Sequence, residues 1–171
     1  YIFPRVETFI TESTYGNPER TSPDRKESEE SFKKHVLKVI KRGGKLLLPV
    51  LGVGRSQEIM VLLEELFRER KINNVPIYID GMVWDITAIH TAYPEFLNNN
   101  VRKLIFHKDQ NPFLRENFNR VGSKKERKSV IEDEGSCIVM ATSGMLVGGP
   151  SVEYLKHLSS NPKNSLIFVS Y

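Results

Sequence analysis

Three short stretches of this chain place chemically capable side chains directly after an apolar run. They contain Glu12, then Arg55 with Ser56, and finally Thr142 with Ser143. In sheets of parallel strands, ligands bind at the carboxyl ends of the strands. These residues are therefore the first candidates for a functional site, and each stretch also has a purely structural interpretation.

Glu12 is a lone acid between an apolar run and the small residues Ser13, Thr14 and Gly16. A carboxylate at a strand end can orient a histidine, act as a base or bind a metal ion. It can also cap a helix or make a structural hydrogen bond. Acids are common at strand ends, and a fold does not by itself give a function.

Gly54, Arg55 and Ser56 suggest a phosphate cradle, because amides at a helix start and a guanidinium both attract phosphate. Gly52 and Gly54 allow the sharp turn that such a cradle needs. The stretch matches neither GxGxxG nor a P-loop, which would require a lysine. A tight strand-to-helix turn capped by Ser56 is an equally good interpretation.

Thr142, Ser143, Gly144 and Met145 follow a third apolar run and form a second candidate loop. The Ser143 hydroxyl and the loop amides could hold an oxyanion or a phosphate. The alternative is a glycine-rich turn into a helix that has Pro150 in its first turn. Ser143 lacks the GxSxG context of a hydrolase nucleophile, and no histidine is placed by spacing to serve it.

The histidines and the single cysteine argue against a metal site and a thiol nucleophile in this chain. His35, His90, His107 and His157 are far apart in the sequence and show neither HxH nor HxxxH spacing. Cys137 rules out an internal disulfide and fits a reducing compartment. Its apolar neighbours are expected to raise its pKa, which makes it a poor nucleophile.

Short apolar runs predict the strands that would position these residues. Most are apolar throughout rather than alternating, which is typical of strands covered on both faces. The predicted strands are 6–11, 45–50, 75–80, 137–141 and 165–170, with a weaker candidate at 101–106.

Segments with apolar residues at the 3.6-residue period predict helices between these strands. The predicted helices are 27–44, 55–71, 84–97 with an interruption at Pro94, 123–135 and 149–162. The alternation of strand and helix predicts an α/β fold, with a parallel sheet between two layers of helices. The long connections are 17–28 and 106–127, and the second could be a surface excursion or a lid.

Length, charge and composition limit the domain count and the class of protein. The chain has 171 residues, enough for one ordinary domain with a sizeable core. Its formal net charge of +4 permits contact with nucleic acid without arguing for it. No apolar run is long enough to span a membrane, and the start lacks the features of a signal peptide. The missing initiator Met indicates either trimmed residues or a piece of a longer polypeptide.

The three candidate stretches together resemble a known family. "ESTYG", "GGKLLLPVLGVGRSQE" and "MATSGMLVGGPSVEYLKHL" occur in the order and spacing of β-CASP nucleases, the RNA- and DNA-processing branch of the metallo-β-lactamase superfamily. "YIDGMVWDITAIHTAYPEFL" and "NPF" are most similar to the archaeal cleavage and polyadenylation specificity factor homologues, which often carry KH domains. The resemblance covers nearly the whole chain.

The resemblance implies a Rossmann-like, three-layer β-CASP domain over residues 1–171. Residues 1–16 and 165–171 would lead from and back into a metallo-β-lactamase domain absent here. Glu12 matches the motif A acid, which orients a downstream histidine for general acid catalysis. Residues 54–56 and the loop 142–145 would face a cleft that admits single-stranded RNA.

The zinc ligands of the family, an HxHxDH motif with a further His and Asp, have no counterpart in this sequence. The resemblance therefore implies two zinc ions in the intact enzyme and none in this chain, which is expected to be inactive alone. It implies an RNA-clamping domain of a cytoplasmic, zinc-dependent ribonuclease in mRNA 3′-end processing or RNA maturation and decay. Its expected partners are RNA and the metallo-β-lactamase and KH domains of the same polypeptide.

Two other interpretations stay open at this point. The chain could be a free-standing RNA- or nucleotide-binding module, which the parallel sheet and glycine turns allow. It could also be a small α/β hydrolase or phosphatase that uses Glu12, Asp80 or Ser143, although the sequence places no base or metal to assist them.

Overall fold

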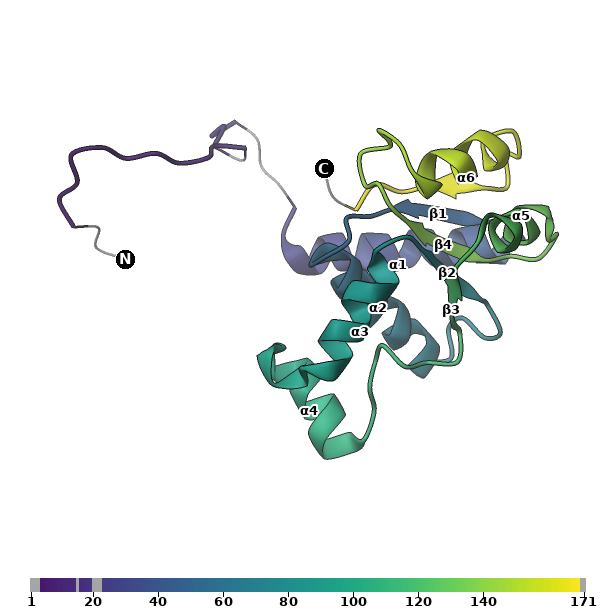
Figure 1. Ribbon diagram of the computed structural model, residues 1–171, viewed down its shortest axis with the longest axis horizontal. Coiled ribbons are helices and arrows are strands. Elements are labelled where there is room, and N and C mark those ends of the chain that lie inside the picture. Colours follow the sequence, from purple (N-terminus) through teal and green to yellow (C-terminus); the bar gives the residue numbers. More distant parts are fainter. Residues whose placement is uncertain (1–3, 15, 20–22, 170–171) are drawn as a thin grey trace.

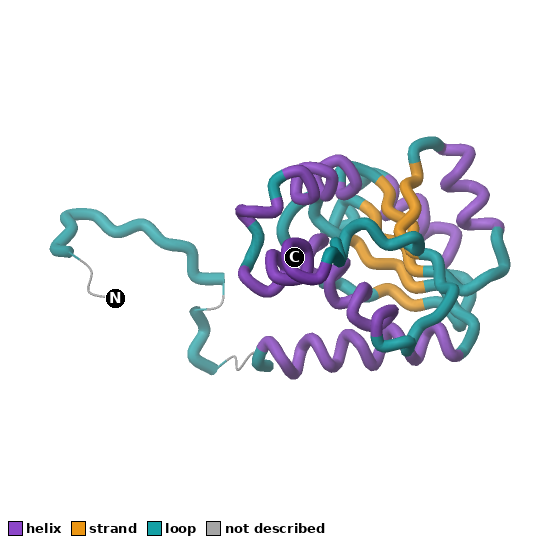
Figure 2. Tube along the Cα trace, turned by 90° about the horizontal axis from the view of Figure 1, so that it is seen from below, coloured by secondary structure: helices purple, strands orange, loops and turns teal. Residues whose placement is uncertain are grey.

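A parallel sheet with helices on both faces forms the body of the protein (Figures 1 and 2). The structure, a computed structural model, describes residues 4–14, 16–19 and 23–169. In this part of the chain the strands are β1 (Leu46–Pro49), β2 (Ile77–Asp80), β3 (Phe118–Val121), β4 (Ile138–Ala141) and β5 (Ser165–Leu166). The helices are α1 (Arg25–Lys41), α2 (Arg55–Arg68), α3 (Val83–Ala92), the 3₁₀ helix η1 (Pro94–Phe96), α4 (Asn99–Lys108), α5 (Lys124–Glu132) and α6 (Pro150–Leu158).

The strands lie in the order β3-β2-β4-β1-β5, and every neighbouring pair is parallel. In the central pair, Leu46 of β1 lies opposite Ile138 of β4. Because successive residues of a strand point to opposite faces, Leu46 and Leu48 pack with α1 to α4, while Leu47 packs with α5 and α6. The predicted three-layer α/β fold is confirmed.

A topological switch point lies between β1 and β4, two neighbouring inner strands of the sheet. The chain leaves β1 for α2 on one face of the sheet and leaves β4 for α6 on the other face. Loops that diverge from neighbouring strand ends leave a crevice between them, where ligands bind in open α/β sheets. The fold therefore directs attention to the loops after these strands.

The three central predicted strands and all the predicted helices are confirmed, but the run 6–11 is not a strand in this structure. Residues 4–14 form an exposed segment that extends away from the sheet (Figure 1). The strand pairings of the described residues join the strands β1 to β5 to one another, and none of them includes this segment. At the other end, β5 is shorter than predicted, and residues 170–171 lie outside the described part.

The weaker strand prediction at 101–106 is wrong, because these residues belong to α4. Asn98 caps this helix, and its side chain accepts hydrogen bonds from the amides of Asn100 and Val101. Val101 and Ile105 then face the core one turn apart, which a strand could not achieve. Local capping and the helical spacing outweighed the β-branched composition.

Strand β3 was missed and lies inside the predicted connection 106–127. It is an edge strand with the short sequence "FNRV", in which Phe118 and Val121 are buried and Arg120 is exposed. Four residues without a continuous apolar run give little strand signal. Its pairing with β2 is what places it in the sheet.

No helix of the described residues is long and apolar enough to cross a membrane.

Candidate functional site

The loops after β1, β2 and β4 come together at the carboxyl edge of the sheet, and we call residues 50–54, 81–82 and 142–149 the carboxyl-edge loops. The amide of Val50 donates to the Ala141 carbonyl at 3.0 Å, and the amide of Thr142 donates to the Asp80 carbonyl at 3.3 Å. These bonds hold the three strand ends side by side.

Glycines allow the loops to approach this closely. Gly81 has φ +91°, and a Cβ added there would lie 2.2 Å from the Thr142 hydroxyl oxygen. A Cβ on Gly144 would lie 3.1 Å from the amide nitrogen of Leu51. A larger residue at either position would push the loops apart, so the sequence requires a close approach here.

The β1–α2 loop is anchored by a glutamine rather than by the predicted serine cap. Gly54 occupies the N-cap position with φ +83°, and its amide donates to Gln57 Oε1 at 2.8 Å. The Gln57 amide group in turn donates to the hydroxyl of Thr87 at 3.0 Å. This buried pair ties the loop to α3.

Arg55 and Ser56, adjacent in the sequence, have opposite environments. The Arg55 side chain is about half exposed at 52%, and its guanidinium forms an ion pair with Glu58 one turn along α2. Ser56 is fully buried, and its hydroxyl donates to the Gly52 carbonyl at 3.2 Å. Only Arg55 of this pair presents its side chain to a ligand at the surface.

The loop after β4 is held by Ser151, which is fully buried in the first turn of α6. Its amide donates to the Thr142 carbonyl at 2.9 Å and its hydroxyl to the Ser143 carbonyl at 2.8 Å. The Ser143 hydroxyl accepts from the Val147 amide at 3.3 Å. Of the predicted residues here, Gly144 is buried and Met145 is exposed.

Large apolar side chains project from the carboxyl-edge loops into solvent. Val147 is 85% exposed, and the other members are between 41% and 63% exposed. They are Leu51, Val53, Met82 and Met145. Sequence reasoning identified only Met145 among them. The available signal was that apolar residues continue past the ends of the strands, where polar loop residues are usual.

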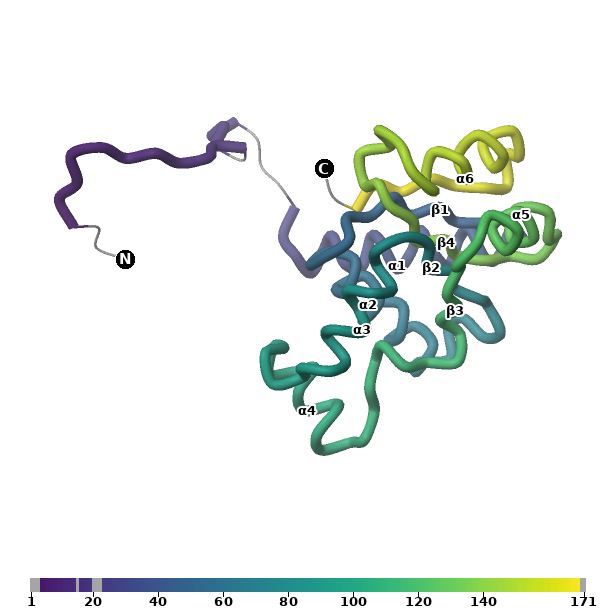
Figure 3. Tube along the Cα trace, viewed as in Figure 1, coloured from purple at the N-terminus to yellow at the C-terminus, as the bar shows by residue number. Residues whose placement is uncertain are grey.

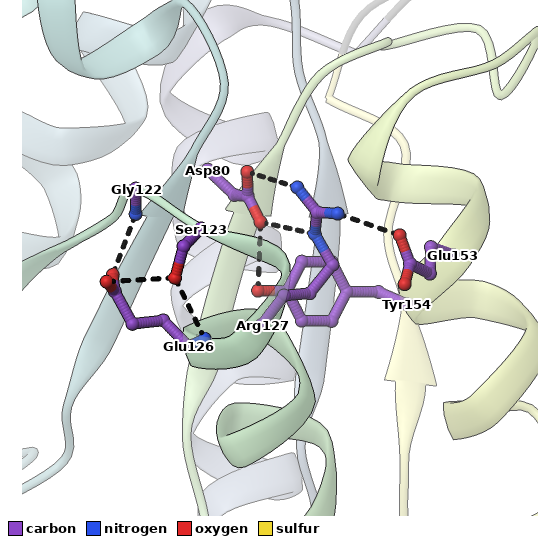
Figure 4. Close-up of polar contacts among 7 residues, drawn as sticks. All are labelled: Asp80, Gly122, Ser123, Glu126, Arg127, Glu153 and Tyr154. Atoms are coloured by element: carbon purple, nitrogen blue, oxygen red, sulfur yellow. Dashed lines mark hydrogen bonds and ion pairs between the residues drawn. The ribbon is translucent and has the colours of Figure 1, made fainter.

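Asp80, the last residue of β2, lies in a buried ion-pair network (Figure 4). Arg127 of α5 donates to both of its carboxylate oxygens, at 2.7 Å from Nε and 3.0 Å from Nη2. The Tyr154 hydroxyl donates to Asp80 at 3.1 Å, and Arg127 donates to Glu153 at 2.8 Å. The network therefore joins β2, α5 and α6.

Arg127 and Tyr154 of this network keep their protons at neutral pH. Hydrogen bonds to Asp80 raise the pKa of Arg127 above its ordinary value. Burial and the nearby Asp80 charge raise the pKa of Tyr154. The Tyr154 hydroxyl therefore remains a donor to the carboxylate.

Glu126 positions the start of α5, and with it the neighbouring Arg127 (Figure 4). Its carboxylate accepts from the Gly122 amide at 2.8 Å and from the Ser123 hydroxyl at 3.0 Å, while Ser123 accepts from the Glu126 amide. Ser123 is therefore the N-cap of α5, and the Glu126 side chain holds the residues that precede the helix. The hydrogen bonds from the Gly122 amide and from the Ser123 hydroxyl lower the pKa of Glu126.

Comparison with known proteins assigns the family. The Beta-Casp domain family matches residues 56–171, which is more than half of the chain and includes α2, β4 and the loop after β4. The chain belongs to the β-CASP family. The family that the sequence resembled is thereby confirmed.

Relatives of this β-CASP domain include archaeal proteins named transcription termination factor FttA. The chain is 55% identical to the protein of Methanocaldococcus jannaschii, 53% to that of Thermococcus kodakarensis and 52% to that of a Lokiarchaeum species, over 169 residues in each case. Each match covers 99% of this chain and 26% of the relative. The chain thus spans about a quarter of the length of these relatives.

Glu12 lies on the exposed segment 4–14, which extends away from the sheet in Figure 1. Its carboxylate accepts a hydrogen bond from the Thr14 amide at 2.8 Å. Hydrogen bonds from Thr14 lower the pKa of Glu12, so it is an anion at neutral pH. Of the other residues in the hydrolase interpretation, the Asp80 carboxylate is bound by Arg127 and Tyr154, and the Ser143 hydroxyl accepts from the Val147 amide.

The described residues of the β-CASP domain do not fit a zinc centre. No three of their His, Cys, Asp and Glu side chains gather closely enough to hold a metal ion. Cys137 is buried, and burial raises the pKa of its thiol to about 11. The expected rise of its pKa is confirmed, and the thiol stays protonated at neutral pH.

Proposed function

We propose that this β-CASP domain clamps single-stranded RNA within a larger zinc-dependent ribonuclease. The process in which that protein acts is transcription termination, after the name of its archaeal relatives, or related RNA 3′-end processing. The observation that supports this role is the gathering of Arg55 and the exposed apolar residues around the switch point between β1 and β4.

The chemistry of this edge suits an unpaired RNA strand. Guanidinium groups bind phosphates, and apolar side chains such as Met145 can lie against the faces of unstacked bases. A phosphate would have to displace Glu58 from Arg55. Exposed ion pairs on a helix contribute about 0.3–0.5 kcal/mol, so this exchange costs little.

Glu12 would act beyond this chain, as the acid that orients a histidine of the metallo-β-lactamase part of the same polypeptide. Two zinc ions would require ligands from outside the described residues, and no catalytic step is assigned to this chain. The intact protein would carry KH domains as well and would work in the cytoplasm, where its RNA substrate is made.

The test of RNA contact at the carboxyl edge is the Arg55→Ala variant. Its affinity for a fluorescein-labelled oligouridine should fall about tenfold, and the slope of log affinity against log salt should decrease by about 0.7 for one lost phosphate contact. Lys128→Ala is the matched control, because Lys128 also forms an exposed helical ion pair, with Glu132 at 3.6 Å. Equal affinities and salt slopes for Arg55→Ala and the unaltered chain would exclude this contact.

A nuclease assay tests the expected inactivity of the chain alone. The purified chain should leave labelled RNA intact with and without added zinc. Cleavage that is abolished by a chelator and by Glu12→Gln would overturn this expectation. Submicromolar RNA affinity of the isolated chain would instead favour the alternative of a free-standing RNA-binding module.

A further inference from the structure

The projection formed by α3, η1 and α4 carries cations that no group of the described residues neutralises. In Figures 1 and 3, α4 lies at the periphery of the molecule, on the long connection between β2 and β3. Arg102, Lys103 and Lys108 are exposed, and within the described part of the chain their side chains form neither ion pairs nor hydrogen bonds with other residues. The first turn of α4 contains no acid.

An aromatic ring lies among these cations. Phe106 is 59% exposed, and together with Asn99, Arg102, Lys103 and His107 it lines a shallow hollow of about 140 Å³ on α4. Residues 102 and 106, and likewise 103 and 107, are one helical turn apart, so they share one face. We call these five residues the α4 basic surface.

This combination occurs on no other α-helix that the structure describes. The lysine-rich helices α1 and α5 have no exposed aromatic residue, since Phe32 of α1 is buried. Phe96, on the adjoining η1, adds a second ring that is 83% exposed. A large apolar side chain in water is unfavourable unless a partner covers it, so two exposed rings beside unpaired cations indicate a binding surface.

We propose that the α4 basic surface is a second contact for single-stranded RNA, outside the carboxyl-edge loops. Arg102 and Lys103 bind successive phosphates, and a base stacks on Phe106, with the Asn99 amide available for a base edge. Cations that follow a backbone and aromatic rings that stack on bases are the two components of sequence-tolerant single-strand binding. An RNA that spans both sites is held at two points, which raises its overall affinity.

The exposed ring of Phe106 favours RNA over an acidic protein as the partner of this surface. Lysine and arginine alone attract any polyanion, whereas an exposed Phe106 within the same hollow gains more from a planar base than from aspartate or glutamate side chains. This inference rests on the proposed RNA-clamping function and adds a location to it. The unpaired state of Arg102 and Lys103 contrasts with Arg55, whose guanidinium already has a partner in Glu58.

The experiment measures fluorescence anisotropy of labelled 20-nucleotide oligouridine with the full chain at several salt concentrations. Arg102→Ala/Lys103→Ala should weaken binding about tenfold and decrease the salt slope by about 1.4, which corresponds to two phosphates on a single strand. Phe106→Ala should weaken binding at least fivefold at an unchanged salt slope, because stacking is not ionic. Lys124→Ala/Lys125→Ala on α5 removes the same charge from an exposed, aromatic-free helix and should change affinity less than twofold.

Each other result has a definite meaning. If the unaltered chain binds no RNA, the proposed function is wrong and this inference fails with it. If Arg55→Ala weakens binding but the α4 variants do not, the carboxyl-edge role stands and the α4 inference is overturned. Equal losses of RNA affinity for the α4 and α5 double variants would show that net charge alone attracts the RNA, which would also overturn the α4 inference. Displacement of RNA by poly-glutamate at equal charge concentration would indicate a surface for acidic polypeptides and would also overturn the α4 inference.

Discussion

Removal of the Arg127 guanidinium should destabilise this domain more than any exposed charge substitution, because it leaves Asp80 buried without its counter-ion. Asp80 is 3% exposed, and Arg127→Met deletes both of the hydrogen bonds that its carboxylate receives from the guanidinium. Among the described residues, only the Tyr154 hydroxyl would still donate to the Asp80 carboxylate. Loss of one partner from a buried pair costs about 3–5 kcal/mol.

The contact between Arg127 and Glu153 adds little to this figure. The Glu153 side chain is 45% exposed, and an exposed ion pair contributes at most about 1 kcal/mol. The expected loss is therefore about 3–5 kcal/mol in the free energy of unfolding. For a domain of this size, 1 kcal/mol corresponds to about 2–4 °C, so the melting temperature should fall by roughly 6–20 °C.

Urea unfolding followed by far-ultraviolet circular dichroism measures this loss, with Arg120→Met as the matched control. Arg120 has the same side chain, but its ion pair with Asp85 is 3.5 Å long and exposed on both sides. The control should cost less than about 1 kcal/mol. In the double variant Asp80→Asn/Arg127→Met, the loss should be smaller than the sum of the single losses, because the unpaired charge is gone.

The reasoning would be refuted if Arg127→Met and Arg120→Met cost the same, within about 0.5 kcal/mol. Strict additivity in the double variant would also contradict it, since that result would mean that Asp80 and Arg127 contribute independently.

Two further predictions concern stability. Gly81→Ala should reduce the free energy of unfolding in urea by about 1–3 kcal/mol more than Gly43→Ala does. Both glycines have positive φ, but only a Cβ at position 81 would collide with Thr142. Equal losses for the two variants would exclude a steric role for this contact. The raised pKa of Cys137, about 11, contributes stability that is present below the ordinary thiol pKa and is lost as pH rises through about 9 to 11. Between pH 8 and pH 10.5 the unaltered chain should lose about 2 kcal/mol more than Cys137→Ala, and parallel pH profiles of the two proteins would contradict this.

The central strands and the helices were predictable because their signals are local. Residues 45–50, 75–80 and 137–141 are apolar without interruption, and only burial on both faces explains such runs in a globular chain. The stripe of Phe32, Val36 and Val39 likewise indicated a helix packed on that sheet. Residues 101–106 were predicted as a strand but form part of α4, which shows the limit of such local signals. The cap at Asn98 and the contact of Val101 with the core decided in favour of the helix.

The sequence by itself determined the fold class, the family and the three loops in which a site was sought, because motifs and hydrophobic periodicity are properties of neighbouring residues. Tertiary structure decided which of those residues reach a ligand. Ser56 and Gly144 became buried, whereas Arg55 and Met145 stayed exposed. It also paired Asp80 with Arg127, which is 47 residues away, and left Arg102 and Lys103 of α4 without an ion-pair partner among the described residues. Packing between distant segments sets burial and charge pairing, and no local pattern encodes that packing.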